Sequence, residues 1–479
     1  MRMPNWAGTL ERLPIQGFLV VGLLLLAAPI AGFGAGFGVY PFGNNGKLKM
    51  LYDARQRPQS VLLHGRLHIV FNADARPTKN LRASAVPMGV TFDLEGRTFS
   101  DPVALGPRHT DHHFSPIIWA DERDHLHVLH GCHRTPGQHL VSVEPVRNGS
   151  LRIQWEVMGD IAPKLSYPTV YRISGNREII YYRTDGHTSS WTYRISDDNG
   201  RTWVGPTQDV TDLDAGGRLD WSSYQTKIPS RDGRFLHVVY TDYDDNKHRP
   251  DPKRFFNPRY RREVGNEWKY NLSYFKIDLE SQRVSNAANQ AVQTPIDFDR
   301  SEKHCQIWDT QWRGAGVPPA IALSPGGEPS FLHVLSEDTI QSHRYYYVAR
   351  EGGGWFQTPI CRSSHQWNSG HLRHDDDGSL HAFVVAGEHY LNGGYMDRHG
   401  GGRIEEWVSR DRGRSWSKRR TLSPDGERFA GWRFNNVQPV LHPDGTEVRG
   451  MLLFYGWRDA DAPTAKAFLV VDEAPSRSR

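Results

Sequence analysis

One unit of hydrophobic and polar positions recurs along the chain. It is an apolar stretch, a polar turn and a second strand of Leu-His-Val type, as in "SVLLHGRLHIVFN" (60–72) and "QTKIPSRDGRFLHVVYTDY" (225–243). Alternating or wholly apolar runs joined by Gly, Asp, Asn or Ser predict a β-hairpin. Further copies occupy residues 115–133, 167–183, 318–338, 369–387 and 438–457.

The spacing of these hairpins predicts the architecture. Successive copies begin roughly 50 to 90 residues apart, which leaves room for two more strands in each unit. Seven four-stranded units arranged radially form a seven-bladed β-propeller. The segments "SDDNGRTW" (196–203) and "SRDRGRSW" (409–416) match the Asp-box turn Ser-x-Asp-x-Gly-x-x-Trp, which is typical of such blades. We therefore predict an all-β chain, with a seven-bladed β-propeller over residues 46–475.

Composition agrees with this prediction, and net charge limits the classes of molecule that the protein is expected to bind. The chain has 46 Gly, 30 Pro, 15 Trp, 19 Tyr and 20 Phe, which are turn formers and aromatics rather than helix formers. The net charge of +4 is mild, and its basic residues are scattered except around residues 247–263, so we expect no nucleic-acid partner. We expect a monomer.

The first 45 residues differ from the rest of the chain. Arg2 and Arg12 precede a run that carries no charge from Gly17 until Lys47. This pattern predicts a signal peptide with an apolar centre of about 15 residues. A membrane anchor is the alternative, because the uncharged run is long enough to cross a bilayer. Either segment predicts an exported body that is periplasmic, extracellular or anchored facing outward, with membrane contact only through this segment.

The histidines of "TDHHFSPIIWADERDHLHVLHGCH" (110–133) separate into two kinds. His127 occupies a position that recurs in other units, so we interpret it as structural; the equivalent residues are His68, His237, His333 and His381. His125 falls in the turn and His130 faces away from His127, so both are assigned surface or packing roles. His113 and His133 remain as candidates for chemistry, with His112 as the alternative to His113.

Neighbouring units place further reactive groups at equivalent strand ends. His133 ends the second strand of one unit, and Arg183 ends that of the next, where Tyr167 precedes Pro168 at the first strand. We predict that His113, His133, Tyr167 and Arg183 form one cluster at a mouth of the propeller.

This set of groups favours β-elimination on a uronic acid. An arginine neutralises a carboxylate through two hydrogen bonds, while His and Tyr side chains transfer protons. Neutralising the C6 carboxylate makes the C5 proton acidic and stabilises the enolate-like intermediate. Two alternatives stay open: a non-catalytic carbohydrate-binding propeller, and a glycoside hydrolase, which requires paired carboxylates such as Asp244 or Asp245.

The segment from Asp111 to Arg183 resembles a known group of proteins. "DHHFSPIIWADERDHLHVLHGCH" followed by "SYPTVYRISGNREIIYYR" is similar to the BNR-repeat family that includes the propeller-type ulvan lyases. His113 and His133 stand 20 residues apart, and Tyr167 and Arg183 stand 16 apart, as the family pattern requires. The resemblance implies cleavage of a sulfated, ulvan-like polysaccharide with no cofactor.

The resemblance also implies roles for individual residues. Tyr167 and His113 would be the proton-transfer pair, Arg183 would neutralise the uronate, and His133 would assist binding. The family has a further histidine one blade later, for which Tyr243 and His248 are candidates, with Asn271 as another.

The cysteines suggest a structural metal ion. "KHCQIWD" (303–309) and "CRSSHQW" (361–367) contain Cys305, Cys361 and His304, with His365 nearby in the sequence. These residue types predict a zinc site, or calcium as an alternative. Free buried cysteines are the other interpretation.

Overall fold

The computed structural model shows an all-β chain with little helix among the residues that it describes. These are residues 30–31, 36–46, 51–75, 84–109, 112–147, 153–186, 189–212, 221–244, 254–265, 268–387, 400–458 and 464–472. The helical turns within these ranges are η1 (His112–Phe114), α1 (Phe298–Arg300), η2 (Ser301–Cys305) and η4 (Glu427–Phe429).

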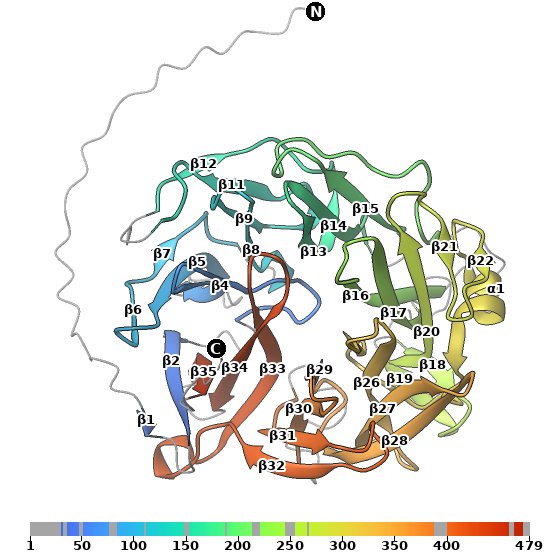
Figure 1. Ribbon diagram of the computed structural model, residues 1–479. Helices are drawn as coiled ribbons and strands as arrows, with labels where there is room; N and C mark the ends of the chain where they lie inside the picture. Colours follow the sequence, from blue (N-terminus) through green and yellow to red (C-terminus); the bar gives the residue numbers. More distant parts are fainter. Residues whose placement is uncertain are drawn as a thin grey trace, which may run out of the picture.

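Antiparallel sheets are arranged around a central axis, in a propeller-like fold (Figure 1). The strands nearest the axis are β3 (Ser60–Leu63), β8 (Ile117–Ala120), β13 (Leu165–Ser174), β16 (Trp221–Pro229), β25 (Ala320–Leu323), β29 (Gly370–His374) and β33 (Trp432–Leu441). Each of these inner strands contacts the next, and β33 contacts β3, so the ring closes.

Each inner strand pairs with the following second strand, which confirms the hairpins predicted from the repeat. The second strands are β4 (Arg66–Ala75), β9 (Leu126–His130), β14 (Arg177–Arg183), β17 (Phe235–Asp244), β26 (Pro329–Ser336), β30 (Leu380–Ala386) and β34 (Glu447–Arg458). The third strands are β5 (Ser84–Asp93), β11 (Gln138–Ser142), β15 (Trp191–Ser196), β20 (Lys269–Asp278), β27 (His343–Glu351), β31 (Arg403–Ser409) and β35 (Thr464–Asp472).

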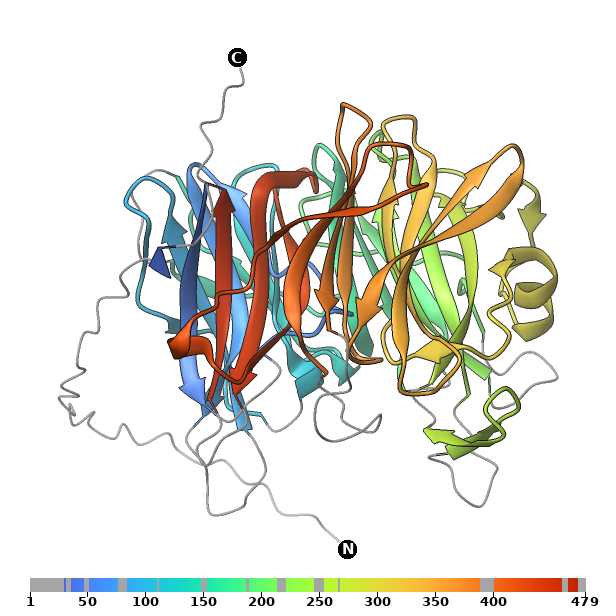
Figure 2. The ribbon, with the colours of Figure 1, turned by 90° about the horizontal axis from the view of Figure 1, so that it is seen from below.

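Shorter strands complete the sheet edges and loops. They are β1 (Ile30–Ala31), β2 (Phe37–Gly46), β6 (Thr98–Phe99), β7 (Val103–Ala104), β10 (His133–Thr135), β12 (Trp155–Val157), β18 (Arg254–Asn257), β19 (Arg262–Gly265), β21 (Val284–Ser285), β22 (Ala291–Val292), β23 (Gln306–Trp308), β24 (Gly314–Ala315), β28 (Gly354–Ser363) and β32 (Ser417–Thr421). In Figure 2 the β18–β19 hairpin projects beyond one face of the ring.

The two ends of the described chain meet in one sheet. β2 pairs with β35, and its residues Phe37, Val39 and Phe42 are buried. With β1 paired to β2, the sheet therefore includes residues that precede residue 46, where we placed the start of the propeller. The reason is that the Gly-rich uncharged run also supplies apolar side chains to the core.

Residues 1–29, which carry most of the predicted signal or anchor, lie outside the described residues. No helix in the described part of the chain has the length and apolar character needed to cross a membrane.

The hydrophobic core lies between neighbouring sheets. One cluster, for example, joins Val61 and Val70 of β3 and β4 to Ile118, Val128 and Leu140 of the next sheet. Each such side chain stabilises the fold by about 1.5 to 3 kcal/mol when it is fully buried. This packing fixes the positions of neighbouring sheets, and the strands in turn position the side chains of the candidate site.

The recurring histidines are structural, as the repeat predicted. All five are at most 5% exposed. Four of them hydrogen-bond to a side chain on the third strand of their sheet: Thr91, His139, Tyr274 and Glu406. Burial lowers the pKa of both His68 and His237 to about 4, so these two are neutral at neutral pH.

Both predicted Asp-box turns are present. In the first, Ser196 Oγ donates to Asp198, the Thr202 amide donates to the same carboxylate, and Trp203 Nε1 donates to the Gly200 carbonyl. The second turn repeats these bonds with Asp411 and Trp416.

Candidate active site

Three adjacent strands bring the predicted residues together. His133 of β10 lies opposite Ser166 of β13, and Ser166 lies opposite Arg183 of β14 on its other side. Tyr167 follows Ser166 at a point where the register shifts, and it has a φ of 55°. A left-handed conformation costs a residue with a side chain about 1 to 3 kcal/mol. The surrounding structure maintains it, in part because Lys227 Nζ donates to the Tyr167 carbonyl at 3.5 Å.

The aromatic rings and the guanidinium are in direct contact. The ring centroids of His113 and His133 are 4.2 Å apart, and each lies within 6 Å of the Tyr167 ring, at 5.6 and 5.9 Å. Arg183 Cζ lies 4.7 Å from the Tyr167 centroid. The four residues that we predicted from spacing therefore form one cluster.

Arg183 is a buried arginine with few acceptors; its Nε donates to the Asp185 carbonyl at 3.4 Å. The side chain is 0% exposed, and among the described residues neither Nη1 nor Nη2 has a hydrogen-bond partner. Its neighbours are the faces of Tyr167, Tyr224 and Trp191. An unpaired buried cation is costly unless it serves a ligand, so this guanidinium is suited to an incoming carboxylate.

The cluster is closed in this structure. Tyr167 is 1% exposed, whereas both imidazoles are half-buried. A second guanidinium, that of Arg55, lies 4.5 Å from the Tyr167 centroid and donates to the phenol oxygen at 3.4 Å. Asp53 in turn pairs with Arg55. A large ligand can therefore reach Tyr167 and Arg183 only if side chains above them move.

Arg55, Asp53 and Tyr224 were not among the predicted site residues. Tyr224 lies 5.5 Å from Tyr167 by ring centroids, with 3.5 Å between their oxygens. The signal for Tyr224 was present, because "SYQT" (223–226) repeats "SYPT" (166–169) at the start of the next inner strand. Arg55 and Asp53 precede the first repeat and carry no comparable signal.

The two guanidiniums act differently on the two phenols. Burial raises the pKa of Tyr167 well above its usual value, against the opposing charges of Arg55 and Arg183. Burial also raises the pKa of Tyr224, but Arg183 and Arg55 outweigh it, and the net pKa is lowered. Tyr167 is therefore a protonated phenol at neutral pH and is suited to donating a proton.

The other predicted binding residues lie in different places. Tyr243 is 2% exposed and packs edge-on against Tyr224 at 5.3 Å, so it adjoins the cluster. Lys269 lies 4.5 Å from the Tyr224 centroid and adds another cation. His248 and Asp245 lie outside the described residues. Asn271 instead donates to Asp242 at 2.8 Å and lines a separate cavity.

The residues predicted to bind a metal do not form a site. Cys305 and Cys361 are buried in two different core clusters, and burial raises the pKa of each thiol to about 12. Over the described ranges, no three His, Cys, Asp or Glu side chains are grouped to hold a metal ion. The structure therefore does not bring Cys305, Cys361 and His304 together, because Cys305 at the end of η2 and Cys361 in β28 face separate core clusters.

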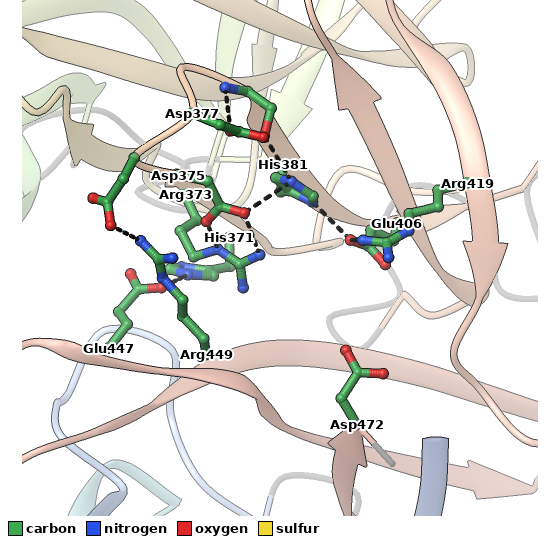
Figure 3. A network of polar contacts seen from close by, with 12 residues as sticks. His371, Arg373, Asp375, Asp377, His381, Glu406, Arg419, Glu447, Arg449 and Asp472 are labelled. Atoms are coloured by element: carbon green, nitrogen blue, oxygen red, sulfur yellow. Dashed lines mark hydrogen bonds and ion pairs between the residues drawn. The ribbon is translucent and has the colours of Figure 1, made fainter. Parts of the chain in front are cut away.

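A second group of ionisable residues, at the sheets of β30 and β34, is internally paired (Figure 3). His381 lies between two carboxylates, 3.1 Å from Asp375 and 2.7 Å from Glu406. Arg420 links Glu406 to Asp472. Because its carboxylates already have cationic partners, we assign this network a structural role.

Comparisons with known proteins agree with the fold. A family model described as "BNR repeat-containing family member" matches residues 90–363. The "Ulvan Lyase-PL25" of Pseudoalteromonas sp. (strain PLSV) is 26% identical over 130 residues, which cover 23% of this chain and 26% of that protein. The ulvan lyase of Nonlabens ulvanivorans is 22% identical over 250 residues, or 48% of this chain and 49% of that protein.

The solved structures extend the likeness in fold to most of the chain. A structure of a PL25 ulvan lyase bound to -[GlcA(1-4)Rha3S]- superposes with a TM-score of 0.68 at 15% identity, covering 89% of this chain and 94% of that one. By sequence, the matched segments span between about a quarter and a half of the curated relatives' length.

Proposed function

We propose that this chain, which belongs to the BNR repeat-containing family, is a polysaccharide lyase. It cleaves a uronic-acid-containing, sulfated, ulvan-like polysaccharide by β-elimination. The observation that carries the proposal is the buried guanidinium of Arg183 against the Tyr167 phenol, with the two imidazoles of His113 and His133 within 6 Å of that phenol. Similarity to curated ulvan lyases supports the same class of substrate.

In the proposed reaction Arg183 binds the C6 carboxylate of the uronate. Neutralising this charge lowers the pKa of the C5 proton and stabilises the enolate-like intermediate. His113 accepts the C5 proton, a double bond forms between C4 and C5, and the bond between C4 and O4 breaks. Tyr167 donates its proton to the departing O4. The raised pKa of Tyr167 supports this assignment, because the phenol remains protonated until the leaving oxygen takes the proton.

His133 and the second guanidinium complete the proposed site. The His133 ring, 4.2 Å from that of His113, assists binding at the half-buried entrance. Arg55 moves off the Tyr167 face as the substrate enters. The positive charges of Arg55 and Lys269 lie over the Tyr224 ring, and they favour binding of an anionic polysaccharide.

Carboxylate chemistry is less well supported at this site. Asp53 is paired with Arg55, Asp242 accepts from Trp221 and Asn271, and Asp244 accepts from Tyr270. Hydrolysis of a glycosidic bond requires two carboxyl groups that flank the bond. We therefore favour elimination over hydrolysis, and we propose that the reaction needs no cofactor.

The proposal extends to architecture and location. The inner strands from β3 to β33 contact one another in a closed ring, which supports seven blades. The basic and then apolar pattern of residues 1–45 supports export, either as a secreted protein or as one anchored by that segment. We propose a monomer whose partner is an anionic polysaccharide.

Ultraviolet absorbance of the unsaturated product tests the proposed reaction. The full chain is incubated with ulvan and with other polyuronates, and both absorbance and reducing ends are followed. We expect the two signals to rise together. Tyr167→Phe is expected to lower kcat by about 10²- to 10⁴-fold, the usual contribution of a general acid or base.

Tyr345→Phe is the matched control, because its buried hydroxyl donates to the Ser369 carbonyl away from the cluster. This control is expected to keep full activity and to lose about 1 kcal/mol of stability. Reducing ends without absorbance would replace elimination by hydrolysis. Glycan binding without turnover, unaffected by Tyr167→Phe, would favour the non-catalytic binding propeller.

A further inference from the structure

The cavity that Asn271 lines has a volume of about 450 Å³ and lies at the start of β20, on the outer side of its sheet. It is lined by Tyr270, Asn271, Phe298, Glu302, Gln306, Ile307, Trp308, Asp309 and Trp312. β20 is two strands outward from β16, which carries Tyr224, so the cavity is about 10 Å farther from the axis. In Figure 1 the helical turn α1, which supplies Phe298, lies at the rim of the ring beside β20.

Two partly exposed indoles give this cavity an aromatic surface. Trp308 packs against Tyr346 at 5.6 Å and Arg313 at 5.2 Å, and Trp312 packs against Tyr270 at 4.7 Å. Neither indole N–H donates a hydrogen bond within the described part of the chain. Because the N–H of a packed Trp usually has an acceptor, two open donors in one cavity suit a polar ligand.

The open acceptors are carboxylates. Glu302 and Asp309 are exposed. Among the described residues, the Gln311 amide donates to Asp309 Oδ1, and neither carboxylate takes part in another hydrogen bond. Donors and acceptors beside aromatic faces suit a sugar ring, whose hydroxyls pair with the polar groups and whose C–H faces stack on the indoles. Two carboxylates disfavour a uronate or a sulfate ester there.

The turn that carries Trp312 is held in a strained conformation. Gln311 and Trp312 both have left-handed backbones, with φ of 53° and 64°. The Trp312 carbonyl accepts from Asn257 Nδ2 and Trp268 Nε1, both at 3.1 Å. Asn271, itself at φ 58°, is joined to Thr310 of the same turn by two hydrogen bonds. Strain that several bonds maintain at one cavity is typical of a pre-organised binding site.

We propose that this cavity is a binding site for an uncharged sugar ring, separate from the cationic cluster around Tyr167. The two sites have opposite charge preferences, so each selects a different kind of sugar. This inference does not depend on the elimination chemistry, since the cavity can bind a saccharide whether or not the chain cleaves one.

Calorimetric titration of the full chain tests the site without any readout of turnover. The probes are neutral hexasaccharides, xylohexaose and cellohexaose, and the acidic counterpart is an oligogalacturonide. The wild type and Tyr167→Phe are both expected to bind a neutral probe. Trp308→Ala and Trp312→Ala are each expected to weaken that binding by about tenfold or more, because each removes a stacking face.

Two further variants keep the test decisive. Phe256→Ala removes an aromatic that is 51% exposed and outside the cavity lining, and it should bind the neutral probe as the wild type does. Glu302→Gln changes an exposed side chain with little risk to the fold, and it should improve oligogalacturonide binding in the Tyr167→Phe background. The inference is overturned if no neutral probe binds the wild type, or if the tryptophan variants bind it unchanged. A chain that binds neutral probes but never cleaves a polyuronate would contradict only the proposed reaction.

Discussion

The proposed role of Arg183 comes with a cost in stability. Its guanidinium is fully buried with two unpartnered nitrogens among the described residues, and aromatic faces surround it. Cation–π contacts contribute about 0.5 to 2 kcal/mol each, which offsets only part of the desolvation cost. Its burial therefore costs the fold more free energy than these contacts return.

Arg183→Met should separate these two effects. We expect kcat on a polyuronate to fall by at least about 100-fold, because the carboxylate loses its neutralising group. We expect the free energy of unfolding to be no lower than that of the wild type, since an apolar side chain of similar length suits the buried site. Urea denaturation and steady-state kinetics measure the two quantities.

Arg420→Met is the matched control for this change. Arg420 pairs with both Glu406 and Asp472. Its loss leaves the carboxylate of Asp472 without this cation and removes one of the cations around the buried Glu406, which keeps Arg419 and His381. We expect a loss of about 2 kcal/mol or more in stability, with activity retained. Comparable destabilisation by both substitutions would show that Arg183 is a structural residue.

At the scale of elements, the Asp-box turns depend on one glycine each. Gly413 has a φ of 84°, and a Cβ added there would lie 2.1 Å from Tyr347 Cε1. Gly327 has a nearly equal φ of 82°, but nothing lies within 4 Å of its added Cβ.

These two glycines form a matched pair for a stability measurement. Gly327→Ala should cost about 1 kcal/mol, the usual penalty of a left-handed alanine. Gly413→Ala should cost at least about 3 kcal/mol, because the collision with Tyr347 adds to that penalty. Equal losses in denaturant unfolding would mean that the turn can shift away from the aromatic ring.

The recurring histidine position predicts opposite pH responses in two sheets. Burial lowers the pKa of His381, but the hydrogen bonds that its ring donates to Asp375 and Glu406 outweigh this effect, and the net pKa is raised. Its stabilising contribution is therefore full below about pH 6.5 and is lost as pH rises through the raised pKa. His68 pairs with Thr91 instead, and burial lowers its pKa to about 4. Its contribution is lost as pH falls below about 6.5.

His381→Gln and His68→Gln should therefore show slopes of opposite sign. The stability advantage of the wild type over His381→Gln should shrink as the pH rises above about 6.5, while its advantage over His68→Gln should shrink as the pH falls below about 6.5. Burial opposes the ionisation of Asp375 and of Glu406, but hydrogen bonds and nearby cations outweigh it and lower the pKa of each, so the two carboxylates that face His381 stay ionised over both of these pH ranges. Parallel pH profiles for the two variants would contradict the assignment of the carboxylate pair to His381.

At the scale of the whole molecule, the ring closes through pairing of β2 with β35. Val39 of β2 is 2% exposed and belongs to a core cluster with residues of β30 and β33 to β35. Val39→Asp should lower the free energy of unfolding by at least about 3 kcal/mol, because it buries an unpaired carboxylate. Val157→Asp, at a strand position that is 66% exposed, should stay within about 1 kcal/mol of the wild type. Equal effects would place residues 37–46 outside the cooperative fold.

The sequence by itself determined the hairpins, the Asp-box turns and the structural histidines, because each depends on neighbouring residues and on a pattern that repeats. It also indicated His113, His133, Tyr167 and Arg183, since equivalent ends of adjacent strands come together in a radial fold. Only the tertiary structure placed Arg55 and Tyr224 against Tyr167, separated Cys305 from Cys361, and included residues 37–46 in the closing sheet. These contacts join segments that are distant in the chain, and their geometry depends on how the sheets pack around the axis, which no local pattern encodes.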